Sequence, residues 1–206
     1  MTKKTKIKVL FSDLGGVLLT NGWDRTSRAK AVELFGLDAQ EFESRHQMLF
    51  GDYEVGKITL DTYLHYTVFS QPRSFSKEIF IDFMYSQSRP NDDTINLIRE
   101  LKSKHGFKIV VISNEGKELT HYRTKTFDLS SFVDYFIVSC FIGIRKPDQN
   151  VYRLALNMVQ VPAEETAYID DRELFVEIAR DFGIHAIHHR NAASTRTALE
   201  ALLNFL

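Results

Sequence analysis

Polar side chains that can do chemistry follow the first four predicted strands of this chain, one group after each strand. In chain order they are Asp13, Ser113 with Asn114, Lys146, and Asp170 with Asp171. Because ligands bind at the carboxyl ends of the strands in an open α/β sheet, we expect these side chains to converge on one site. Carboxylates, a hydroxyl and an ammonium group together suit phosphoryl transfer.

The acidic members of this set predict a magnesium site. Asp13 and Asp170 are the predicted ligands, because Mg²⁺ prefers oxygen donors and is held by a small number of carboxylates. Asp171 is expected to complete the metal site by orienting a metal-bound water. The cation would neutralise a phosphate group, so that the Asp13 carboxylate can approach the phosphorus and attack it.

The remaining members predict a phosphate-binding group. Ser113, Asn114 and nearby backbone N–H groups would donate hydrogen bonds to the phosphoryl oxygens. Lys146 would add a fixed positive charge close to both the phosphate and the nucleophile. Each motif alone is common, since a strand-end aspartate often caps a helix and a Lys-Pro-Asp sequence often starts one. The order of all four motifs at strand ends is what predicts a catalytic site.

Composition excludes several other classes of protein. The 206 residues are 44% hydrophobic and 26% charged, with a formal net charge of −1, which is typical of a globular protein. No basic excess points to nucleic acid, and no apolar run is long enough for a membrane span. The single cysteine, Cys140, rules out an internal disulfide and fits a cytoplasmic protein. The oligomeric state is not indicated.

Alternation of apolar runs and amphipathic segments predicts an α/β fold. Residues 1–20 and 89–206 are expected to form a Rossmann-like core, an open parallel sheet with helices on both faces. The predicted strands are residues 7–12, 107–113, 134–139, 166–170 and 184–189. Continuous β-branched runs such as the one at 107–113 are typical of strands buried on both faces.

Residues 21–88 show helical patterns and no strand. Asp38 with Glu41 has the spacing of a capping box, and Thr59 is expected to cap another helix. About four helices fit into this stretch, which interrupts the predicted core after its first strand. We expect an all-helical cap above the carboxyl edge of the sheet.

The four motifs resemble those of the haloacid dehalogenase-like hydrolases. They read "DLGGVL" around Asp13, "VISN" at Ser113, "RKPD" at Lys146 and "YIDD" at Asp170. The resemblance covers nearly the whole chain, and "GKITLDTYL" at residues 56–64 is similar to a cap segment of the glucose-1-phosphatase-like branch.

This resemblance implies a Mg²⁺-dependent phosphatase that acts on a small phosphorylated metabolite. A sugar phosphate is one candidate substrate. In the family, the first aspartate forms an aspartyl phosphate, and the backbone carbonyl two residues later is a further metal ligand. Those positions are Asp13 and Gly15 in this sequence.

Gly15 is also where the sequence departs from most phosphatases of the family, which carry an aspartate there as general acid and base. Such a group contributes about 10²–10⁴-fold in rate. A phosphatase without it needs a good leaving group or an acid from the cap, and the cap offers Asp24, Asp52 and Glu54. Glycine at this position also occurs in the glucose-1-phosphatase-like branch.

Two other functions stay open from the sequence. A 2-haloacid dehalogenase also lacks the second aspartate and uses no metal, but the pair Asp170-Asp171 disfavours it, because clustered carboxylates repel one another without a cation. The second open function is that of a protein that binds metal and phosphate with little or no turnover. The family often has an acid or asparagine near Leu174 and Phe175, which are expected here on the core face of a helix.

Overall fold

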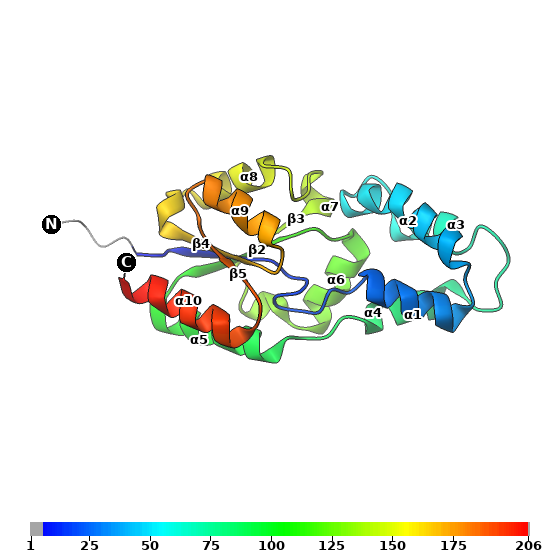
Figure 1. Cartoon of the computed structure of the whole chain (residues 1–206), viewed down its shortest axis with the longest axis horizontal. Coiled ribbons are helices and arrows are strands. Elements are labelled where there is room, and N and C mark those ends of the chain that lie inside the picture. Colours follow the sequence, from blue (N-terminus) through cyan, green and yellow to red (C-terminus); the bar gives the residue numbers. More distant parts are fainter. Residues whose placement is uncertain (1–5, 206) are drawn as a thin grey trace.

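The computed structural model describes residues 6–205, so residues 1–5 and 206 of the predicted core lie outside the described residues. Its centre is a five-stranded parallel sheet in the order β3-β2-β1-β4-β5 (Figure 1). The strands are β1 Val9–Ser12, β2 Lys108–Ser113, β3 Tyr135–Val138, β4 Thr166–Asp170 and β5 His185–His188. This confirms the predicted α/β class, and each strand lies within a predicted strand range.

Helices cover both faces of the sheet. They are α5 Asp92–His105, α6 Lys117–Thr126, α7 Ser139–Ile142, α8 Asn150–Val159, α9 Glu173–Asp181 and α10 Ala192–Phe205, with short 3-10 turns η1 Leu129–Ser131 and η2 Ala163–Glu165. Alternate residues of β2 enter different apolar clusters. Ile109 and Val111 pack with residues of α5 and α10, whereas Val110 and Ile112 pack with residues of α8 and α9. Figure 1 shows α5 and α10 on one side of the sheet and α8 and α9 on the other. This two-sided burial explains why the strand sequence is apolar at successive positions.

Four helices lie between β1 and α5, as the sequence predicts. They are α1 Arg25–Phe35, α2 Ala39–Glu54, α3 Leu60–Thr67 and α4 Lys77–Ser86. Side-chain oxygens cap all four N-termini, which satisfies backbone N–H groups that have no partner within the helix. These capping residues are Asp24, Asp38, Thr59 and Ser76.

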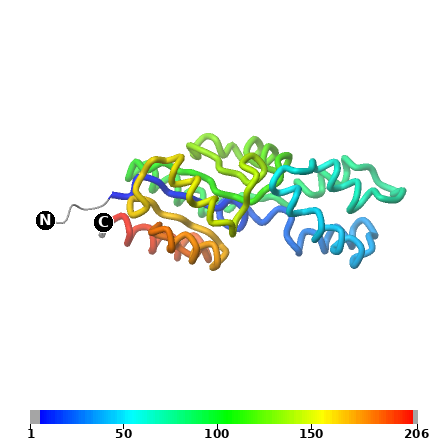
Figure 2. Tube along the Cα trace, turned by 90° about the horizontal axis from the view of Figure 1, so that it is seen from above, coloured from blue at the N-terminus to red at the C-terminus, as the bar shows by residue number. Residues whose placement is uncertain are grey.

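The four helices share an apolar cluster of their own, which includes Trp23, Phe42, Tyr63 and Phe80. They form one end of an elongated molecule (Figures 1 and 2). The exact division into a core and a cap at residues 20/21 and 88/89 stays a prediction. Within residues 6–205, none of the helices has the length and apolar character of a membrane span.

A buried arginine joins the helical end to the sheet. Arg123 of α6 is 1% exposed and forms an ion pair with Glu115. Its Nη2 donates to the Thr20 carbonyl oxygen and its Nε to Ser88 Oγ, each over 2.9 Å. Thr20 and Ser88 belong to the two chain segments that connect the sheet with helices α1–α4. The Arg123 side chain therefore bonds to both chain segments that lead to and from helices α1–α4.

Replacing Arg123 by methionine is expected to lower the free energy of unfolding by about 3–5 kcal/mol, because the Glu115 carboxylate would stay buried without its partner. The matched control is Arg196→Met, which breaks ion pairs with Glu100 and Glu200 on the surface and should cost less than about 1 kcal/mol. Denaturant unfolding measures both, and similar small losses would contradict the role of Arg123.

Candidate active site

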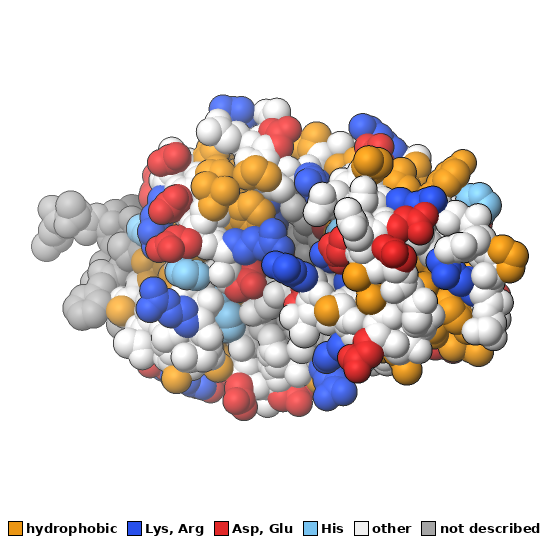
Figure 3. Space-filling model, turned by 45° about the vertical axis from the view of Figure 1, so that its right-hand side comes forward, with side chains coloured by type: hydrophobic (Ala, Val, Ile, Leu, Met, Phe, Trp, Pro, Cys, Tyr) orange, Lys and Arg blue, Asp and Glu red, His pale blue; other side chains and the backbone are white. Residues whose placement is uncertain are grey.

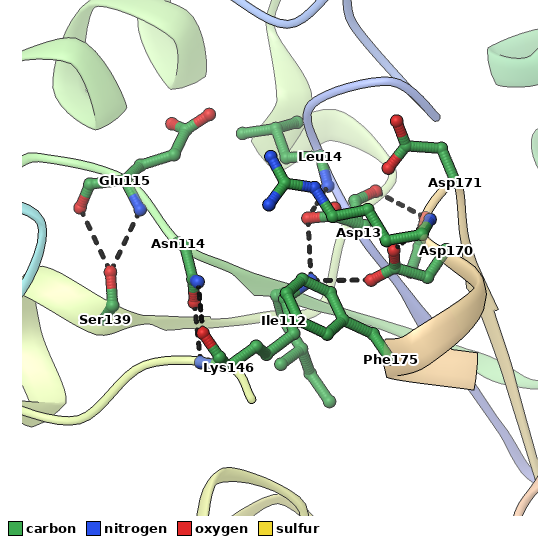
Figure 4. A network of polar contacts seen from close by, with 12 residues as sticks. Asp13, Leu14, Ile112, Asn114, Glu115, Ser139, Lys146, Asp170, Asp171 and Phe175 are labelled. Carbon is green, nitrogen blue, oxygen red and sulfur yellow. Dashed lines mark hydrogen bonds and ion pairs between the residues drawn. The ribbon is translucent and has the colours of Figure 1, made fainter. Parts of the chain in front are cut away.

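Sheet pairing brings the two strand-end aspartates together. Ser12 of β1 pairs with Ile169 of β4, so the next residues, Asp13 and Asp170, lie side by side at the carboxyl edge. Carboxylate oxygens of Asp13, Asp170 and Asp171, one from each residue, all lie within 4.8 Å of one another (Figure 4). The structure thus assembles the three predicted acidic residues from opposite ends of the chain.

Lys146 lies against this carboxylate cluster and is 2% exposed. Its Nζ is 3.1 Å from Oδ1 of Asp13 and 2.7 Å from Oδ2 of Asp170, and it also donates to the Ile112 carbonyl oxygen over 3.0 Å (Figure 4). Three carboxylates against one ammonium leave two excess negative charges in the cluster. That excess equals the charge of one divalent cation.

Burial has the largest effect on the pKa of Asp13. It raises the pKa of Asp13 to about 7, an effect that the Lys146 ammonium opposes and the Asp170 carboxylate increases. Burial disfavours the charged form of Lys146, but the carboxylates of Asp13 and Asp170 more than compensate, so that its pKa lies above the usual value. Without a cation, Lys146 therefore stays protonated, and Asp13 binds a proton more readily than an exposed aspartate does.

The donor set fits a hard divalent cation such as Mg²⁺. All three residues offer carboxylate oxygens, which are the ligands that Mg²⁺ prefers. Oδ1 of Asp171 is buried and has no hydrogen-bond partner within residues 6–205. A buried carboxylate oxygen without a donor is costly, and a cation in the cluster would satisfy it.

Asn114 fixes the backbone of Lys146. Its Oδ1 accepts from the Lys146 N–H and its Nδ2 donates to the Lys146 carbonyl oxygen, both over 2.8 Å (Figure 4). Ser113 lines the same cavity as Asp13 and Lys146. Direct contact of Ser113 and Asn114 with a phosphate group stays a prediction.

A cavity of about 310 Å³ opens above these residues. Its base holds Asp13, Ser113 and Lys146, and its opposite side is formed by residues of the helical end. Those residues include Trp23, Phe50, Tyr53, Glu54 and Met84. Figure 3 shows Lys and Arg side chains near the middle of one face, where the sheet and the helical end meet.

The place of the missing acid at Gly15 is taken by an amide. A β-carbon added at Gly15 would lie 2.8 Å from Oδ1 of Asn21. The Asn21 Nδ2 in turn donates to Oδ2 of Asp171 over 3.3 Å. An amide holds no proton that it can give up near neutral pH, so position 15 and its neighbour supply no general acid.

The expectation that Leu174 lies on a core face is wrong. Leu174 lies in the first turn of α9, and its side chain is 55% exposed and lines the cavity. Phe175 is buried as predicted, with its ring centroid 5.0 Å from Lys146 Nζ. Apolar residues at these positions therefore cover the lysine and border the cavity.

Two residues of the site were missed from the sequence. Tyr168 donates a hydrogen bond to Oδ2 of Asp170. It stands two positions before Asp170 on β4, so the period of a strand puts both side chains on one face and could have identified it. No sequence pattern identifies Asn21, since its contacts depend on how the loop after β1 folds back.

A glycine next to the cluster leaves room for Asp171. Gly16 has φ +77°, and a β-carbon there would overlap the Asp171 carboxylate. We expect Gly16→Ala to displace this carboxylate and weaken Mg²⁺ affinity by about 10–100-fold, the usual effect of disturbing residues that hold metal ligands. Calorimetric titration with Mg²⁺ measures the change.

Gly36→Ala is the matched control, because Gly36 is also left-handed, with φ +59°, and has nothing within 4 Å of an added β-carbon. Gly36→Ala therefore strains the backbone in the same way, but its added β-carbon contacts no neighbouring side chain. Equal Mg²⁺ affinity in the two variants would mean that Asp171 has no part in metal binding.

Comparisons with known proteins agree with this geometry. Residues 7–183 match the profile of the haloacid dehalogenase-like hydrolases. Bifunctional epoxide hydrolase 2 of Rattus norvegicus is 30% identical over 136 residues, which are 64% of this chain and 24% of that protein. This chain therefore spans about a quarter of the length of that relative. Sesquiterpene phosphatase astK of Aspergillus oryzae is 26% identical over 202 residues, 97% of this chain and 98% of that protein.

Solved structures share the fold. The HAD family enzyme bt-2542 of Bacteroides thetaiotaomicron, in complex with magnesium and inorganic phosphate, has a TM-score of 0.76 at 21% identity. The match covers 90% of this chain and 95% of that one. The glucose-1-phosphatase-like branch stays a prediction. The profile and the fold together show that the chain belongs to the haloacid dehalogenase-like hydrolase family.

Proposed function

We propose that this hydrolase is a Mg²⁺-dependent phosphatase that removes phosphate from a small metabolite through an aspartyl phosphate on Asp13. One observation carries the proposal: a buried cluster of three carboxylates and one ammonium at the base of a cavity. Asp13, Asp170, Asp171 and the backbone carbonyl of Gly15 would hold the cation. When bound, Mg²⁺ would neutralise the phosphate and so reduce its repulsion of the nucleophile.

The residues of this chain then have distinct tasks. Asp13 supplies the attacking carboxylate oxygen, held in place by the Leu14 N–H, which donates to its Oδ1 over 2.8 Å. Lys146 stabilises the carboxylate form of Asp13 and faces the charge that develops on the phosphoryl oxygens. Ser113 donates to the phosphoryl oxygens, and Asn114 keeps Lys146 in position.

Relatives support phosphatase chemistry. One relative that this chain matches over almost its whole length is a sesquiterpene phosphatase, and a neighbour with the same fold holds magnesium and inorganic phosphate. A cavity of about 310 Å³ suits a small substrate, and a sugar phosphate is one candidate. The aromatic side chains of the helical end would border the leaving group.

The same cluster disfavours a metal-independent dehalogenase. Asp170 is fully buried next to Asp13, and Asp171 adds a third carboxylate. An enzyme that uses no cation would have to bear the repulsion of these groups with only Lys146 to offset it. A bound divalent cation would offset the repulsion among these three carboxylates.

Release of inorganic phosphate from a panel of phosphate monoesters, with Mg²⁺ present, tests the proposal. We expect turnover that is lost on chelation by EDTA and falls below detection in Asp13→Asn, since the amide cannot attack phosphorus. The Asp52→Asn variant, on an exposed carboxylate of α2 paired with Lys57, is the control and should retain activity.

Other outcomes would identify the alternatives. Chloride release from 2-chloropropionate that persists in EDTA would indicate a dehalogenase. Mg²⁺ binding without turnover across the panel would indicate a binding protein. Either result would contradict the proposed phosphatase.

A further inference from the structure

The proposed reaction needs a proton for the leaving oxygen, and the residues beside the nucleophile do not provide one. Position 15 is glycine, and the amide of Asn21 occupies the space beside it. An acid must then come from elsewhere in the cavity. Within residues 6–205, four carboxyl side chains line it: Asp13, Asp24, Glu54 and Glu115.

Three of these four are committed to other tasks. Asp13 is the nucleophile. Asp24 caps α1, with its Oδ1 accepting from the Ser27 N–H over 2.8 Å. Glu115 is 5% exposed and uses both oxygens, one with the Arg123 guanidinium and one with the Thr120 hydroxyl.

Glu54 lines the same cavity as Asp13 and has a free carboxylate oxygen. It is the last residue of α2 and reaches the cavity from the helical end. Its Oε2 forms an ion pair with Arg145, the residue before Lys146, whereas its Oε1 takes no hydrogen bond within the described residues. The side chain is only 12% exposed, so it faces the cavity rather than open solvent.

The backbone of Glu54 is tied to the phosphate side of the site. Ser139 Oγ donates to the Glu54 carbonyl oxygen over 2.6 Å. The same Oγ accepts from the N–H of Glu115 over 3.0 Å (Figure 4). Glu115 comes two residues after Ser113 in the chain. The end of α2 is thus fixed relative to the loop that would bind the phosphoryl group, as a catalytic acid requires.

Burial raises the pKa of Glu54, and this exceeds the opposing effect of Arg145. Arg172 also favours the carboxylate, whereas Glu115 favours the acid form. These are the charged groups that face Glu54 from the loop before Lys146, from the start of α9 and from the loop after β2. Glu54 is therefore protonated at higher pH than an exposed glutamate, which suits a general acid.

We propose that Glu54 is the general acid and base of the reaction, in place of the aspartate that position 15 lacks; this inference rests on the proposed phosphatase function. As the Asp13 oxygen bonds to phosphorus and the bond to the leaving oxygen breaks, the Glu54 proton passes to that oxygen. The Glu54 carboxylate then takes a proton from the water that attacks phosphorus. Inorganic phosphate leaves, and Asp13 is regenerated as a carboxylate.

Two esters of similar shape test this role. 4-Nitrophenyl phosphate has a good leaving group that needs no proton, whereas 4-nitrobenzyl phosphate has a poor one that does. In Glu54→Gln, we expect alcohol release from the benzyl ester to fall by about 10²–10⁴-fold. Nitrophenolate should still appear in a rapid burst of one equivalent, followed by slow turnover, because water attack on the aspartyl phosphate then lacks its base.

Asp52→Asn is the matched control, because Asp52 lies two residues away on the same helix and is exposed. It should behave as wild type with both esters. A Glu54→Gln variant that slows both first turnovers equally, or neither, would overturn the role of Glu54 and leave the phosphatase function standing. Wild-type protein that hydrolyses no ester of the panel would instead overturn the phosphatase function itself.

Arg145→Gln gives an independent readout in a protein that keeps Glu54. Arg145 lowers the pKa of Glu54, so its loss should raise this pKa further. For the benzyl ester, the fall of kcat at alkaline pH should then move to higher pH. An unchanged alkaline limb would show that Glu54 is not the acid, even if Glu54→Gln fails to fold.

Discussion

Repulsion among three carboxylates is the constraint on which the site depends. Asp13 and Asp170 are buried side by side at the ends of neighbouring strands, and Asp171 extends the cluster. Lys146 offsets one of the three negative charges, while burial and, to a smaller extent, the Asp170 carboxylate raise the pKa of Asp13. A divalent cation would offset the remaining negative charge and would at the same time favour an anionic substrate.

Much of the surrounding structure keeps these charges in place. Asn114 holds the Lys146 backbone, Tyr168 donates to Asp170, and Gly16 leaves room for the Asp171 carboxylate. Such fixed partners matter because a carboxylate or ammonium group that can rotate away loses most of its electrostatic effect on the substrate. The tight packing around Gly16 also explains why a left-handed glycine stands so close to Asp13.

The sheet and the carboxylate cluster could be predicted because both follow from local patterns. Apolar runs define the strands, and parallel strands bring their carboxyl ends to one edge, so Asp13 and Asp170 meet whatever lies between them in sequence. The contacts of Asn21 and the exposure of Leu174 could not be predicted, since they depend on how a loop and a helix turn sit above the sheet. Likewise, the sequence offered three acids before or within the helical end, and only the fold separates Glu54 from Asp52.

Direct titration of the metal-stripped protein with Mg²⁺ tests the central claim, that a divalent cation balances the carboxylate cluster. At pH 7.5, calorimetry should detect one Mg²⁺ per chain, and Asp170→Asn should abolish this binding. Absence of Mg²⁺ binding at millimolar concentration in the wild-type protein, or unchanged binding in Asp170→Asn, would contradict the account.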